Sequence, residues 1–81
     1  MGATDYRKVT ALAVSADSRR CAAAETDHSI WLYEVSTGKA LRHLVGHRNE
    51  VTSLAFTPDG GRLVSTSRDL TSLVWDVSLA P

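Results

Sequence analysis

The histidines of this 81-residue chain are the first candidates for metal chemistry. His43 and His47 lie four positions apart, a spacing that on a helix would place two imidazoles on one face. The surrounding residues predict a strand instead, on which the two side chains do not converge, and no Cys, Asp or Glu completes a tetrahedral set of ligands. The sequence therefore predicts no metal site and places His43 on a strand surface.

The nucleophiles are equally poor candidates for catalysis. The single cysteine, Cys21, excludes an intramolecular disulfide and favours a reducing, cytoplasmic location. We expect it to be a small hydrophobic side chain, not a reactive thiol. Serine, histidine and aspartate are present without a Gly-x-Ser-x-Gly elbow, and Gly60-Gly61 lies in a predicted hairpin turn, not in a phosphate-binding loop. We predict no enzyme activity and no cofactor, and a hydrolase stays a remote alternative.

The charge of the chain is balanced, with nine basic and nine acidic residues. Such a balance creates no long-range field for nucleic acid or an anionic membrane. We expect the like-charged pair Arg19-Arg20 to lie on a solvated surface. No apolar run approaches the roughly 18–20 residues of a membrane span, and residues 1–8 form a polar leader without a signal-peptide core. These observations predict no nucleic-acid partner, no membrane and a cytoplasmic location.

Short apolar and β-branched runs alternate with turn residues along the chain. Glycine in the turns Ser36–Lys39 and Pro58–Gly61 is suited to a positive φ. The run RCAAAE is the least convincing strand because three alanines have low β-propensity. The pattern predicts an antiparallel all-β meander, with strands near residues 9–15, 20–25, 30–35, 40–45, 51–57, 62–67 and 72–77.

The chain repeats itself after 42 residues without a gap. The residues that recur unchanged include Val9/Val51, Thr10/Thr52, Leu12/Leu54, Ala13/Ala55, Asp17/Asp59, Arg20/Arg62 and Asp27/Asp69. The same shift aligns Cys21 with Leu63 and Trp31 with Leu73, so we expect Trp31 to pack in a core. A period of this length with four strands agrees with the roughly 40–45 residues of one propeller blade.

The second copy carries Gly46-His47, the turn from Thr57 to Gly60, the turn aspartate Asp69, and Trp75-Asp76. In these markers the chain resembles the WD-repeat β-propellers over residues 9–78. The resemblance implies an all-β fold of antiparallel four-stranded blades: about two blades with seven strands, the second blade lacking its outer strand. We expect a degenerate first repeat at residues 9–47 and a second repeat at residues 48–81.

The resemblance also implies a structural hydrogen-bond network in the second repeat. Its members would be His47, Ser65, Asp69 and Trp75. In the first repeat, Ala23 and Tyr33 replace the serine and the tryptophan, so the network cannot form there in the usual way. We expect the first repeat to be the less stable one.

Propellers of this family use their narrow face to dock peptides and proteins, which implies a protein or peptide partner. The residues that would form a partner-binding face beside the network are Arg48, Asn49, Glu50 and Arg68. We expect a non-catalytic protein–protein interaction scaffold that is a fragment or the C-terminal end of a larger propeller, with neighbouring WD repeats around it. The alternative is self-assembly, in which several copies close a six- or eight-bladed propeller. Either assembly would cover the faces and the edge that two repeats leave exposed.

Overall fold

A computed structural model describes residues 9–78 of the chain, and the described part contains seven β-strands and no helix. The strands are β1 (Val9–Val14), β2 (Arg20–Glu25), β3 (Ile30–Glu34), β4 (Ala40–Leu44), β5 (Val51–Phe56), β6 (Arg62–Ser67) and β7 (Ser72–Asp76). The expected all-β fold is confirmed, and each predicted strand range ends within one residue of the observed one. The leader at residues 1–8 lies outside the described residues. Within residues 9–78, no helix is long and apolar enough to cross a membrane.

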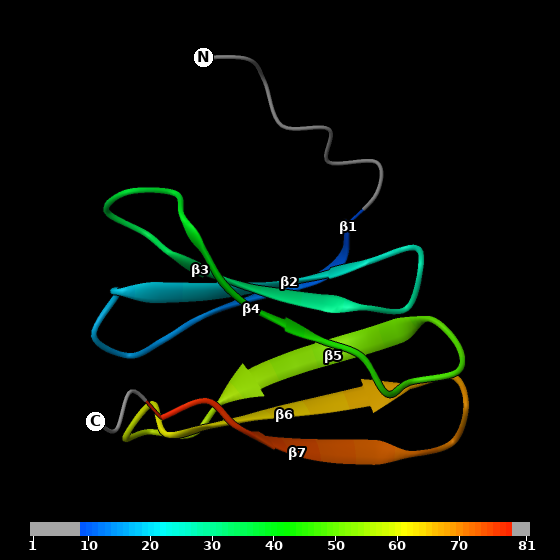
Figure 1. The fold of residues 1–81 in the computed structure, drawn as a ribbon. Coiled ribbons are helices and arrows are strands. Elements are labelled where there is room, and N and C mark those ends of the chain that lie inside the picture. Colours follow the sequence, from blue (N-terminus) through cyan, green and yellow to red (C-terminus); the bar gives the residue numbers. More distant parts are fainter. Residues whose placement is uncertain (1–8, 79–81) are drawn as a thin grey trace.

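The seven strands form two antiparallel sheets that lie face to face (Figure 1). The first sheet has the order β1-β2-β3-β4, and the second sheet has the order β5-β6-β7. Within each sheet, every strand pairs with the next one along the chain through a short turn, as in a meander, and residues 45–50 connect β4 to β5 of the other sheet. Within the described residues β7 has a neighbour on one edge only, which agrees with the expected lack of an outer strand in the second unit.

The two sheets repeat each other down to the irregularities of their backbone. The register of β1 shifts between Val9 and Ala11, and the register of β5 shifts at the equivalent place, between Val51 and Ser53. Because a register shift of this kind alters the local twist of a strand, its recurrence means that both sheets are shaped in the same way.

The turns that open the second strand of each sheet are also built alike. The Asp59 carboxylate accepts hydrogen bonds from the Gly61 N–H at 2.9 Å and from the Thr57 hydroxyl at 2.8 Å. Asp17 does the same in the first sheet with the residues at the matching positions. Gly60 has a φ of +72°, the left-handed conformation that glycine adopts without steric cost.

The hydrophobic core lies between the two sheets. Ala22 and Ala24 on β2 are fully buried, and β2 lies against β5 of the other sheet. Small side chains suit this position because they let two sheets approach closely, so tertiary packing outweighs the low β-propensity of alanine. The buried members of the core are Ala22, Ala24, Ile30, Leu32, Leu44, Val51, Leu54, Leu63 and Val77.

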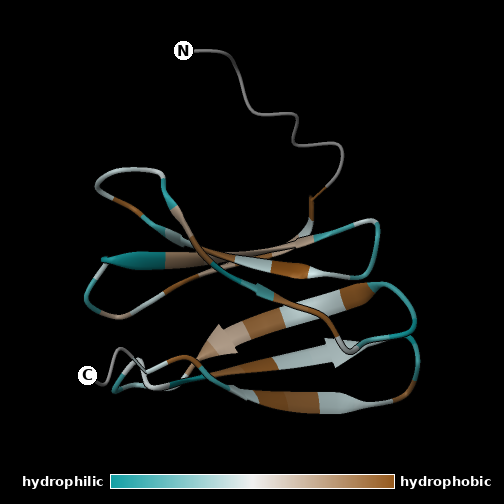
Figure 2. Ribbon diagram, in the orientation of Figure 1, coloured by the Kyte–Doolittle hydropathy of each residue, from teal (hydrophilic) through white to brown (hydrophobic). Residues whose placement is uncertain are grey.

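Only one face of each sheet is covered. Successive side chains of a strand point to opposite faces, and Leu12 and Val14 on β1 are 59% and 61% exposed on the outer face of the first sheet. Val74 on β7 is 63% exposed on the outer face of the second sheet. Figure 2 shows that the hydrophobic residues fall largely on the strands, whereas the turns are mostly hydrophilic. The two outer faces therefore carry apolar surface that suits a further contact.

The expectation that Trp31 packs in the core is wrong. Trp31 is half-buried on the outer face of the first sheet, where its ring stacks on His43 with centroids 3.9 Å apart and planes 8° from parallel. The physical reason is that its equivalent, Leu73, faces the first sheet, whereas no described segment covers Trp31. Cys21 on the same face is half-buried, and burial raises the pKa of its thiol, which keeps it protonated.

Candidate functional site

Four polar side chains from different segments meet in the second sheet. His47 lies in the connection before β5, Ser65 lies on the central strand β6, and Trp75 lies on β7. His47 Nε2 is 2.6 Å from the Ser65 hydroxyl, and the Trp75 indole N–H donates to the same hydroxyl at 2.9 Å. His47 Nδ1 is 3.3 Å from the carboxylate of Asp69, which lies in the β6–β7 turn. The structure thus brings together the four residues of the expected network.

The protons of this network fit one arrangement. The indole of Trp75 can only donate, so it uses a lone pair of the Ser65 oxygen. The Asp69 carboxylate can only accept when ionised, so the proton of a neutral His47 lies on Nδ1 and points to Asp69. Nε2 then accepts from the Ser65 hydroxyl. Every donor has an acceptor in this arrangement, which is the condition for burying polar groups at low cost.

Asp69 ties the turn at the end of β6 to the segment before β5. Its carboxylate accepts from the backbone N–H groups of Arg48 and Thr71, both at 2.9 Å, and from the Thr71 hydroxyl. The Thr71 hydroxyl, the Arg48 N–H and the other donors hold the pKa of Asp69 well below its usual range. The carboxylate is therefore ionised at neutral pH, as the orientation of His47 requires.

Ser65, His47 and Asp69 follow the order of a catalytic triad, with hydroxyl, imidazole and carboxylate in line. The geometry nevertheless gives this serine no route to a substrate. Ser65 has no exposed surface, and its oxygen already accepts from Trp75. A nucleophile must reach the reacting carbon, so burial of the hydroxyl favours a structural role over hydrolysis.

Gly46, which precedes His47, lies against the tryptophan of the network. A Cβ atom at this position would be 3.0 Å from the Trp75 ring and 3.2 Å from the Leu73 side chain. Both distances are shorter than ordinary van der Waals contact. The absence of a side chain therefore lets the segment before β5 run close over the indole.

The first sheet holds only a remnant of this arrangement. Asp27, the equivalent of Asp69, accepts hydrogen bonds from the backbone N–H of Ser29 at 3.0 Å and from its hydroxyl at 2.6 Å. Ala23 stands at the serine position and is 7% exposed, and Tyr33 stands at the tryptophan position. The aspartate thus closes its own turn in the first sheet, but the serine and the tryptophan that complete the network in the second sheet are replaced there.

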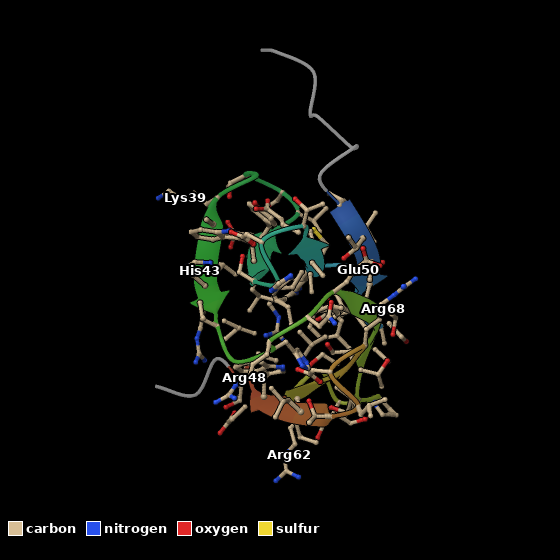
Figure 3. The ribbon with its side chains drawn as sticks, turned by 90° about the vertical axis from the view of Figure 1, so that its right-hand side faces the viewer. Lys39, His43, Arg48, Glu50, Arg62 and Arg68 are labelled. Atoms are coloured by element: carbon tan, nitrogen blue, oxygen red, sulfur yellow. The ribbon has the colours of Figure 1, made fainter. Side chains whose placement is uncertain are left out.

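The residues expected at a partner-binding face lie at the end of the molecule shown in Figure 3, where Arg48, Glu50 and Arg68 are labelled. The Arg68 N–H donates to the Glu50 carbonyl at 2.9 Å, and their side chains form an ion pair at 3.4 Å. Asn49 precedes Glu50 in the sequence, and its carbonyl accepts from the Ser67 hydroxyl at 3.1 Å. The structure therefore places the four residues on two adjoining segments, with Arg48, Asn49 and Arg68 exposed and Glu50 partly so.

No group of three or more potential metal ligands occurs within residues 9–78. His43, which is exposed, is occupied by its stacking on Trp31 and lies on a different sheet from His47. Two cavities of the described chain are lined by residues of turns and adjoining strand ends at the end opposite Arg68, and none of the network side chains lines either of them.

Arg20 is the residue that sequence reasoning missed. The expectation that it lies on a solvated surface is wrong, since it is 6% exposed and donates to the carbonyls of Gly60 and Val77 in the other sheet. Its guanidinium carbon is 5.6 Å from the centre of the Phe56 ring. The repeat gave no signal of this burial, because the arginine that recurs at position 62 is exposed.

Comparisons with known proteins identify the architecture. The family model described as WD domain, G-beta repeat, matches residues 38–76. The chain belongs to the WD-repeat family. It is 42% identical over 67 residues to a periodic tryptophan protein 2 homolog of Neurospora crassa, which covers 82% of this chain and 8% of that protein. It is 34% identical over 76 residues to WD repeat-containing protein 1 of Mus musculus, at 90% and 12% coverage.

A further relative is nuclear distribution protein PAC1 of Arthroderma benhamiae, which is 39% identical over 59 residues, with 73% of this chain and 13% of that protein covered. The chain thus spans 8% to 13% of the length of these three relatives. WD-repeat domains are in general non-catalytic interaction domains, and two antiparallel sheets of four and three strands agree with propeller blades.

Proposed function

We propose that this WD-repeat segment binds a protein or peptide partner through the four residues Arg48, Asn49, Glu50 and Arg68, and that it has no catalytic activity of its own. The observation that carries the proposal is that the exposed segment from Arg48 to Glu50 is held by hydrogen bonds to two consecutive residues of the β6–β7 turn, Arg68 and the partly buried Asp69. Asp69 binds the Arg48 backbone, and its neighbour Arg68 binds the Glu50 backbone.

Such attachment matters because a binding surface with a fixed backbone loses little conformational entropy when the partner arrives. The side chains that point outward include two arginines, whose planar guanidinium groups bind carboxylates in a bidentate manner. A peptide with acidic residues is therefore the partner chemistry that this surface favours. In this proposal His47, Ser65 and Trp75 hold the surface in place and do not touch the partner.

Selection of peptides from a random library against the immobilised chain tests this proposal. We expect the enriched peptides to carry acidic residues and to bind the Arg48→Ala and Arg68→Ala variants more weakly, by roughly tenfold each for a lost charged hydrogen bond. Arg62→Ala is the matched control, because Arg62 is also exposed but lies on the outer face of β6. Equal binding by the wild type and both surface variants would refute the proposed surface.

The hydrolase alternative requires turnover that depends on Ser65. We expect the wild type and Ser65→Ala to give the same background rate with an activated ester, because the hydroxyl is buried. A rate that is well above background in the wild type and absent in a folded Ser65→Ala variant would restore the alternative.

We further propose a cytoplasmic location, supported by the single cysteine. We also propose neighbouring WD repeats as partners, supported by the exposed apolar residues on the outer faces of the two sheets.

A further inference from the structure

Arg20 joins the two sheets by binding two carbonyl groups. It lies at the start of β2 in the first sheet, and its guanidinium donates to the carbonyl of Gly60 in the β5–β6 turn and to that of Val77 after β7. Phe56 lies under the guanidinium at 5.6 Å. Hydrogen bonds from a charged donor in a buried place are among the stronger contacts in a protein, so this arginine is a main element of the contact between sheets.

The contact has two halves, the arginine of one sheet and the two carbonyls of the other. The residues equivalent to each half lie on the outer face of the other sheet. Arg62 occupies the place of Arg20 at the start of β6, but its side chain is exposed, and Figure 3 shows it projecting away from the molecule. The equivalents of Gly60 and Val77 in the first sheet are Ser18 and Val35. These two residues line a cavity of about 370 Å³, together with Arg19, Glu34 and Ser36.

We propose that the cavity lined by Ser18 and Val35 is a guanidinium site, and that Arg62 of a second copy of this chain fills it. The Ser18 and Val35 carbonyls would accept from Arg62 as those of Gly60 and Val77 accept from Arg20. Glu34 adds a carboxylate to the lining at the position that Asp76 holds in the second sheet. The site therefore combines two acceptors with an opposite charge.

The apolar side chains near the cavity and those near Arg62 would also pack together as their equivalents do in the existing contact between the sheets. On the first sheet, the exposed Leu12 is the equivalent of Leu54, which is 8% exposed in the existing contact between the sheets. On the second sheet, the exposed Val74 is the equivalent of Leu32, which is fully buried in that contact. Apolar surface would thus be covered on both partners when the second sheet of one copy packs on the first sheet of the next.

Two differences from the existing contact predict that association between copies is weak. Val14 stands in the place of Phe56, so Arg62 would lose the aromatic ring beneath it. Arg19 stands in the place of Gly61 and brings a like charge to the cavity. The contact uses different surfaces on the two copies, so it is heterologous and continues beyond a dimer, to a ring or an open chain.

The test is the mass of the chain in solution as a function of concentration, measured by light scattering or sedimentation. We expect the wild type to associate as the concentration rises and Arg62→Ala to weaken association by roughly 10- to 100-fold, the loss expected for hydrogen bonds to a charged group. Arg68→Ala is the matched control, because it removes an exposed arginine at the other end of the molecule and should leave association unchanged.

A second variant makes the cavity more like the existing Arg20 site, and it should associate more tightly than the wild type if the proposal is correct. Val14→Phe combined with Arg19→Gly restores the ring and removes the like charge, so association should tighten by about two- to fivefold or more. Adding Arg62→Ala to this variant should abolish the gain. Circular dichroism and melting curves at low concentration establish that each variant is folded.

Three results would overturn the proposal. They are a mass of one chain at every concentration in both the wild type and the rebuilt variant, equal association of Arg62→Ala and Arg68→Ala, and tightening that survives removal of Arg62. Peptide binding at Arg48 and Arg68 is measured separately at the opposite end of the molecule. Either proposal can therefore fail without the other.

Discussion

The two sheets share a backbone design but hold themselves together in different ways. The second sheet has three strands and a buried polar network around Ser65. The first sheet has four strands, with Ala23 in the serine position and an apolar interior in which Ile30 and Leu32 have no exposed surface. A complete set of strands and a polar network are thus two separate means of stabilising the same arrangement.

Strand pairing and register therefore do not depend on the network. The register shift in β1 and the aspartate-closed turns recur in the first sheet without the histidine, serine and tryptophan. What the network adds is local: it attaches the segment before β5 and the β6–β7 turn to the sheet. We therefore expect changes in the network to affect the second sheet and its surface more than the fold as a whole.

The largest difference between the sheets should appear at the leucine they share. Leu54→Ala should lower the free energy of unfolding by about 2–5 kcal/mol, because it opens a cavity in the core between the sheets. Leu12→Ala, the same change at the equivalent position, should cost less than about 1 kcal/mol because this side chain is 59% exposed. Urea denaturation measures both, at a concentration low enough to exclude association. Equal costs would mean that the outer face of the first sheet is covered.

The next largest difference concerns the two arginines. Arg20→Ala should cost about 2–3 kcal/mol, because the Gly60 and Val77 carbonyls lose a buried, charged donor. Arg62→Ala should change the free energy of unfolding by no more than about 0.5 kcal/mol, since this side chain is exposed. Thermal melts of the two variants in dilute solution make the comparison. A neutral Arg20→Ala would show that the contact between the sheets rests on apolar burial alone.

A smaller effect should follow from exchanging serine and alanine between the sheets. Ser65→Ala should cost about 1–3 kcal/mol, because the Trp75 N–H and His47 Nε2 lose their shared partner. Ala23→Ser should not recover this amount, since the residue 42 positions before His47 is Asp5, so the first repeat has no histidine at the position that would accept the hydroxyl proton. Its cost should be about 1 kcal/mol. Denaturation curves combined with tryptophan fluorescence report both, and stabilisation by Ala23→Ser would contradict the comparison.

The smallest effect is a dependence of stability on pH. The folded pKa of Asp69 lies below its ordinary value of 3.8, so the ionised carboxylate stabilises the folded state above that pH. The contribution is lost as the pH falls through and below 3.8. The melting temperature of the wild type should therefore drop on acidification from about pH 5, and Asp69→Asn should flatten that drop.

Asp27→Asn is the matched variant in the first sheet. The pKa of Asp27 is also lowered, by the side chain and backbone of Ser29, so its pH profile should flatten in the same direction. The change should be smaller than for Asp69→Asn, because Asp27 has fewer donors. Identical profiles for the two variants would show that the link to His47 contributes nothing.

Most of the fold could be predicted from local patterns. The repeat after 42 residues, the turn aspartates and the β-branched runs placed all seven strands, because turn chemistry and strand periodicity are properties of neighbouring residues. The four residues of the network could be named from the motif, and the structure brings them within hydrogen-bonding distance. The burial of Arg20 could not be predicted, because it depends on carbonyls about 40 and 57 positions away in the chain.

The sequence alone determined the strand order, the turns and the imbalance between a network-bearing and a network-free repeat, since each follows from residue types at short spacing. Which face of each sheet is buried depends on how the two sheets pack together. Arg20 and Arg62 occupy equivalent positions of the repeat, as do Leu12 and Leu54, yet the members of each pair differ in exposure. The reason is that the contact between the two repeated units covers one face of each and leaves the other to solvent. That asymmetry gives the molecule an arginine at one outer face and a cavity for a guanidinium at the other.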